Sequence, residues 1–116
     1  MTVEQVNERI QNGGALDMRQ LIYLLKNNRT IRRQAEMALR RESKKAAGEV
    51  VQYVDGLING LSEEHAKLIR ALYVEGLSWL QAEQRVCMTR NTIGRNRKEA
   101  LQEMLHIANG TLKEPA

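Results

Sequence analysis

Residues 61–105 have the sequence LSEEHAKLIRALYVEGLSWLQAEQRVCMTRNTIGRNRKEALQEML, which carries three helix starts in close succession. Ser62, Ser78 and Thr89 are each placed to begin a helix, because their hydroxyls accept hydrogen bonds from free backbone N–H groups. Gly76 is placed to end a helix. The spacing predicts a helix of about 13 residues, a short one of about 9, a tight turn and a long last helix.

Three helices joined by very short turns are typical of a helix-turn-helix unit. The short helix braces the last one, which projects one face into the major groove of DNA. On a helical wheel, Ile93, Ala100 and Met104 share one side of the last helix. The opposite side carries Asn91, Arg95, Lys98 and Gln102. Because Arg pairs with guanine and Asn or Gln with adenine, this side is suited to recognising base edges.

The predicted DNA-binding residues are Thr89, Arg90, Asn91, Thr92, Arg95, Arg97, Lys98 and Gln102. In this interpretation Asn91, Arg95 and Lys98 face the groove, and Arg90 and Gln102 lie at its margins. Thr89, Thr92 and Arg97 contact the phosphate backbone, and the helix start also attracts phosphate to the two threonines. Gly94 either allows close approach to DNA or is a tolerated cost of roughly 1 kcal/mol relative to Ala. Trp79 is interpreted as a core residue beneath the last helix.

These features resemble a known family. Residues 61–105 are similar to the region 4 helix-turn-helix of sigma factors, and more closely to sigma-like phage regulators of the ArpU and RinA type. The family-like positions are Leu61, Ser62, Glu63, Tyr73, Gly76, Ser78, Thr89, Thr92, Arg95, Arg97, Ala100 and Leu101. The resemblance implies sequence-specific binding to double-stranded DNA and transcriptional control of phage or prophage genes, often late genes.

The sequence departs from the family pattern at three places. Ala82 lies one residue further from Thr89 than in the commoner pattern, and Cys87 stands where glycine is frequent. These departures predict a non-standard turn. Arg97 falls on the apolar side of the last helix, where it either reaches a phosphate or pairs with Glu64 or Glu75. Residues 1–60 match no family pattern.

The N-terminal half is also predicted to be helical. Asp17 caps a helix with apolar residues at positions 18, 21, 22 and 25, and Asn27 and Asn28 end it. Thr30 caps a second helix over residues 31–47, whose thin apolar face indicates a solvent-exposed or partner-bound helix. Gly48 breaks or bends the chain. A rich apolar stripe then covers residues 50–61, with a helix end near Gly60.

Two interpretations of these apolar faces stay open. The stripe of residues 50–61 and the helix of residues 18–25 bury each other within one chain, or they form the interface of a dimer. The net charge of +4 is unevenly spread, because residues 29–45 hold seven basic and two acidic residues. This basic segment is either a solvated helix face or a set of added phosphate contacts.

Composition argues against other classes of protein. Aromatic residues make up 3% of the chain, which is few for a platform that stacks single-stranded nucleic acid. His65 and His106 are the only histidines, and no Cys/His spacing suits a metal. We therefore expect no catalytic residue, no cofactor and no metal site. One cysteine, no signal-peptide core and no apolar run of membrane length favour a cytoplasmic protein.

The sequence thus predicts an all-α, non-enzymatic protein. We expect a helical N-terminal region over residues 1–48 for oligomerisation or support, a DNA-binding domain over residues 49–110, and a tail over residues 111–116. The expected partners are double-stranded DNA, RNA polymerase and a second copy in a homodimer, with no membrane. Two alternatives are a small terminase subunit that recognises viral DNA for packaging, and a helical module that binds RNA polymerase or another regulator.

Overall fold

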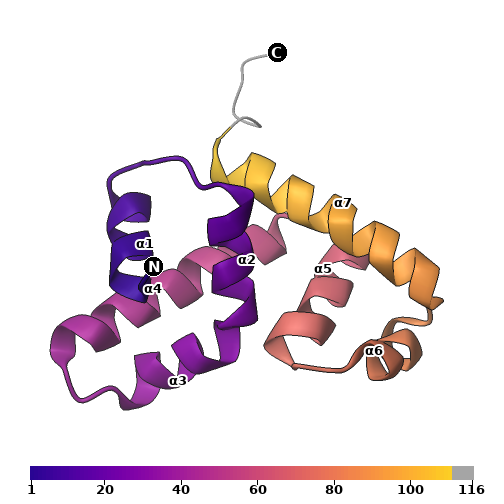
Figure 1. Ribbon diagram of the computed structural model, residues 1–116, viewed down its shortest axis with the longest axis horizontal. Helices are drawn as coiled ribbons and strands as arrows, with labels where there is room; N and C mark the ends of the chain where they lie inside the picture. The colour runs from indigo at the N-terminus through magenta and orange to yellow at the C-terminus, as the bar shows by residue number, and fades with distance from the viewer. Residues whose placement is uncertain (111–116) are drawn as a thin grey trace.

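The computed structural model describes residues 1–110, and these form seven α-helices (Figure 1). In chain order they are α1 (Val3–Gln11), α2 (Met18–Lys26), α3 (Asn28–Met37), α4 (Arg41–Asn59), α5 (Glu63–Ile69), α6 (Trp79–Val86) and α7 (Arg90–Ala108). After α5 the helix widens into a π-helical segment, η1 (Arg70–Val74). The described residues contain no strand, so the predicted all-α class is confirmed. The predicted tail lies outside the described residues.

Four helix starts coincide with predicted capping residues. The Asp17 side chain accepts a hydrogen bond from the Gln20 backbone N–H at 2.8 Å, and the Gln20 side chain accepts one from the Asp17 N–H at 3.0 Å. Ser78 caps α6 with the same reciprocal pattern. The side chains of Ser62 and Thr89 accept from the third residue of α5 and α7. Four of the five predicted starts are therefore confirmed, and the fifth is wrong, because Thr30 lies inside α3 and caps no helix.

The predicted helix over residues 31–47 is wrong. Helix α3 begins at Asn28 without a side-chain cap and ends at Met37, and Ala38 takes an extended backbone conformation. The chain reverses there, and α4 starts at Arg41. The reversal lays the apolar face of α3, which includes buried Ile31, against α4. If residues 31–47 formed one straight helix, the apolar face of α3 could not pack against α4. Packing between the two helices therefore determines where α3 ends, although the local sequence favours a longer helix.

The predicted break at Gly48 is also wrong. Helix α4 runs unbroken from Arg41 to Asn59, and the domain boundary expected at residue 48 falls inside it. A Cβ built on Gly48 meets nothing within 4 Å. The predicted end of this helix near Gly60 is confirmed, since Gly60 is its C-terminal cap.

One large core joins both halves of the chain. It includes Leu21, Leu24 and Leu25 of α2, Val50, Val54, Leu57 and Ile58 of α4, and Ala100, Leu101 and Met104 of α7. The interpretation that the two N-terminal apolar faces bury each other within one chain is confirmed. These faces are covered, so they do not supply the interface of a dimer.

A smaller core lies under the last two helices. It is formed by Leu68, Ala71, Ala82, Val86 and Ile93. Helix α7 belongs to both cores, because Ile93 lies in the small one and Met104 in the large one. In Figure 1, α1–α4 lie together on one side, α5 and α6 lie on the other, and α7 runs along both. None of the helices within residues 1–110 has the length and apolar character to span a bilayer.

We expect Met104→Ala to lower the free energy of unfolding by about 2–5 kcal/mol, because Met104 is fully buried and its truncation leaves a cavity. Leu39→Ala is the matched control, since Leu39 in the α3–α4 turn is fully exposed and its loss changes stability by less than about 0.5 kcal/mol. Urea denaturation followed by circular dichroism measures both values. Equal effects of the two substitutions would contradict the assignment of the core.

Candidate nucleic-acid interface

The turn between α6 and α7 keeps a glycine-like backbone conformation. Cys87 has φ 57° and ψ 45°, in the left-handed region, and is the only non-glycine residue among residues 1–110 with positive φ. Glycine occupies this region with little strain, whereas a side chain costs about 1–2 kcal/mol there. Cys87, which stands where the family pattern has glycine, therefore adopts the backbone conformation of a glycine. The connection between α6 and α7 stays short although the side chain differs. Thr89 follows and caps α7.

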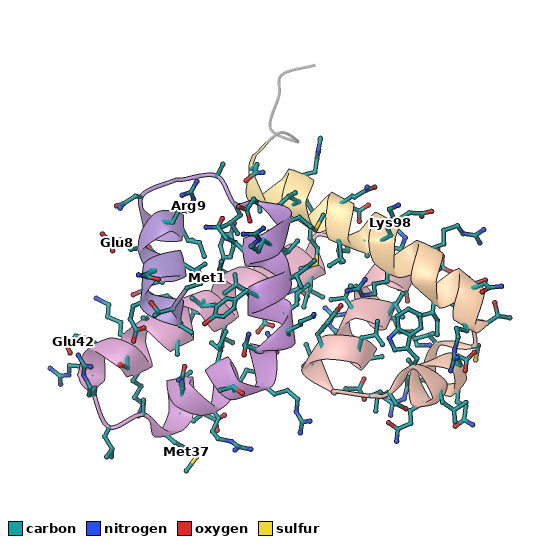
Figure 2. All side chains as sticks on the ribbon, in the orientation of Figure 1. Met1, Glu8, Arg9, Met37, Glu42 and Lys98 are labelled. Atoms are coloured by element: carbon teal, nitrogen blue, oxygen red, sulfur yellow. The ribbon has the colours of Figure 1, made fainter. Side chains whose placement is uncertain are left out.

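Helix α7 presents a polar strip to solvent. Asn91, Arg95, Lys98 and Gln102 are exposed, and Ile93, Asn96 and Ala100 on the other side are buried. Figure 2 labels Lys98 on the outer side of α7. Arg90 and Thr89 are exposed at the start of the same helix, and Thr92 is half-buried. The structure thus brings seven of the eight predicted contact residues to the exposed side or the first turn of α7.

Arg97 is the exception, because its side chain turns inward. Its Nε donates a hydrogen bond to the Tyr73 hydroxyl at 2.6 Å, and its guanidinium carbon lies 5.8 Å from the centre of that ring. Neither acid named as an alternative partner pairs with it. Glu64 accepts a bond from Asn96 at 3.4 Å, and Glu75 is bonded to Arg85. Arg97 therefore ties α7 to η1.

Trp79 lies at the edge of the polar strip. Its side chain is packed against α7, with two ring carbons 3.8 Å from the position a Cβ would take on Gly94. The residue is 38% exposed, so it is a boundary residue and not the buried core residue predicted. A methyl group at position 94 would make ordinary van der Waals contact with the ring. An alanine at position 94 would therefore also leave room for the Trp79 ring, so the packing of Trp79 does not explain why residue 94 is glycine.

His65 joins α5 to the acidic side of α7. Its Nε2 lies 3.6 Å from a Glu99 carboxylate oxygen and its Nδ1 lies 3.7 Å from one of Glu103. The backbone N–H of His65 donates a hydrogen bond to the Ser62 hydroxyl at 3.4 Å, and Ser62 thereby caps α5. Glu99 and Glu103 therefore lie on the side of α7 near His65 of α5, apart from the polar strip. Among the described residues, no group of three His, Cys, Asp or Glu side chains is arranged to hold a metal ion.

Comparison with protein-family models, with curated proteins and with solved structures finds no match for this chain. The candidate interface is therefore defined by its own geometry. It consists of the polar strip on the exposed face of α7, whose opposite face is buried in the two cores. The short turn at Cys87 and helix α6 lie next to it.

We expect Cys87→Gly to raise the free energy of unfolding by about 0.5–1 kcal/mol. Glycine adopts the left-handed backbone conformation without the cost that a side chain carries, which stabilises the folded state. Its greater conformational freedom in the unfolded chain cancels part of this gain. Cys87→Ala is the control, because it removes the thiol and keeps the strained backbone. Thermal denaturation of both variants checks the prediction, which fails if Gly and Ala behave alike.

A double-mutant cycle tests the inward position of Arg97. Tyr73→Phe, Arg97→Met and the double variant should show a coupling of about 1 kcal/mol in unfolding free energy, because the bond joins a charged donor to a half-buried hydroxyl. Strictly additive losses in chemical denaturation would mean that the two side chains act independently.

Proposed function

We propose that this protein binds double-stranded DNA sequence-specifically and regulates transcription, as the similarity to sigma-like phage regulators implies. The observation that carries the proposal is the exposed strip of Asn91, Arg95, Lys98 and Gln102 on α7. An α-helix fits the major groove of B-DNA, and these side chains match the donors and acceptors that bases present there. The action is binding, and no bond is made or broken.

Each side chain of the strip has a proposed role. Arg95 and Lys98 donate to guanine, Asn91 pairs with adenine, and Gln102 lies at the margin of the groove. Thr89 and Arg90, exposed at the start of α7, contact phosphates, where the helix dipole also favours negative charge. Arg97 is reassigned as a positioning residue, because its guanidinium is bound to Tyr73.

One observation favours the module that binds RNA polymerase or another regulator. Met37 and Leu39 are exposed apolar residues at the α3–α4 turn, and exposed Arg40 and Arg41 follow directly. Figure 2 places Met37 and Glu42 at the far end of the molecule from α7. Apolar residues beside basic ones suit an acidic protein surface. This second function is compatible with DNA binding, since it uses a different end of the molecule.

The test is binding of duplex DNA by Arg95→Ala and Lys98→Ala variants. Each is expected to lose about 1–3 kcal/mol of specific binding free energy and to relax the base preference at one position. Lys67→Ala, on the exposed side of α5, is the control and should bind normally. Retained fragments of sheared genomic DNA, sequenced after washing at increasing salt, identify the operator.

Uniformly weak binding that vanishes by about 200 mM salt would contradict the proposal, because only the phosphate contribution would be present. Retention of fragments at a packaging site by large ring oligomers would favour the terminase alternative. Mass measurement in solution separates such rings from a dimer at a promoter.

A further inference from the structure

We propose that the corner between α2 and α3 is a second phosphate-binding patch, which extends the DNA footprint beyond the helix-turn-helix unit. The patch consists of Lys26, Arg29 and Arg33. It rests on the proposed function, because it assumes that α7 lies in the major groove. It also divides the basic segment of residues 29–45 into a part that contacts DNA and a part that does not.

The three cations surround one shallow hollow. Lys26, Arg29, Thr30 and Arg33 line a depression of about 370 Å³, and all four residues are exposed. The Thr30 hydroxyl adds a donor at the same place. A phosphate group carries negative charge and several acceptor oxygens, so it suits three cationic donors grouped with a hydroxyl.

The positive charge of the patch is not neutralised by neighbouring acids. Arg32, on the same helix, is bonded to Asp55 on α4 and to Asn28 at 2.7 Å, so it faces the protein. Within residues 1–110, no ion pair involves Lys26, Arg29 or Arg33. Glu36 lines the adjoining hollow beside Arg33, and Glu75, the neighbour of Gly76, is bonded to Arg85.

Arg29 connects the patch to the helix-turn-helix unit. Its Nη1 lies 2.7 Å from the position a Cβ would take on Gly76, and its Cδ lies 3.0 Å from it. Gly76 has φ +71° and stands two residues before Ser78, the cap of α6. The arginine therefore packs directly on the loop that leads into the bracing helix.

The helix that follows this loop contacts α7. Trp79, the first residue of α6, packs against Gly94 of α7, and Gly94 lies between Asn91 and Lys98 along the helix. A chain of direct contacts thus runs from Arg29 through Gly76 and the start of α6 to the strip. A duplex whose groove receives α7 also passes phosphates over the surface that flanks the groove, and we infer that the patch contacts them there.

The remaining basic residues of the segment lie elsewhere. Arg41, Lys44 and Lys45 are exposed on the first turns of α4, at the opposite side of the molecule from α6 (Figure 1). They carry the same charge as the patch and come from the same segment of the sequence. They therefore provide a control with the same number of positive charges at a different position.

The experiment compares two triple variants of the full chain. One is Lys26→Gln, Arg29→Gln and Arg33→Gln, and the other is Arg41→Gln, Lys44→Gln and Lys45→Gln. Fluorescence anisotropy with a labelled operator duplex and a random duplex gives the dissociation constant from 50 to 300 mM salt. Circular dichroism verifies that both variants fold.

Loss of three phosphate contacts should reduce the slope of log K against log salt by about 2–3 in the patch variant, and weaken binding to both duplexes about ten- to hundredfold. The ratio of operator to random affinity should stay unchanged, because phosphate contacts carry no base information. The α4 variant should keep the slope of the unmodified chain.

Equal losses in both triple variants would overturn the proposal, because a general charge effect would explain them. An unchanged slope in the patch variant would overturn it as well. The Arg95→Ala variant separates this failure from failure of the proposed function. If Arg95→Ala loses operator preference while the patch variant binds normally, α7 recognises DNA without the patch.

Discussion

Burial of α7 in two separate cores leaves one face of a long helix exposed to solvent. Ile93 anchors its first half in the small core under α6, and Met104 anchors its second half in the large core with α2 and α4. Because the buried residues follow one face of the helix, the opposite face must be polar and must point to solvent. The Arg97–Tyr73 bond secures the middle of the helix between the two cores.

The same large core explains the position of the N-terminal basic residues. The apolar stripe of α4 needs partners, and α3 supplies them only because the chain reverses after Met37. The reversal separates the basic segment of residues 29–45 in space. Its first residue, Arg29, lies beside Gly76, and its last residues lie on the first turns of α4. Packing of apolar residues thus determines where the charges of the surface are found.

Features that depend on a few neighbouring residues could be predicted from the sequence, and features that depend on distant contacts could not. Asp17, Ser62, Ser78 and Thr89 cap helices because each acts on backbone groups three residues away. The solvent-facing strip of α7 follows from helical periodicity in the same way. The end of α3 at Met37 and the inward turn of Arg97 depend on α4 and on Tyr73, which are remote in the sequence. Helix α1 has a local signal, the reciprocal cap of Thr2 and Gln5, that the hydrophobic pattern alone does not indicate.

The unbroken course of α4 through Gly48 has a consequence for the proposed binding of DNA. The helix spans the large core from the N-terminal half to the loop before α5, so the chain has no flexible linker at residue 48. The surface proposed to bind DNA with both halves would keep a fixed spacing, so a duplex that touched both parts would have to adapt its shape to the protein. Bending energy depends on base sequence, and pyrimidine–purine steps deform most easily. Rigidity in the protein would then select operators by their deformability, at base pairs that no side chain touches.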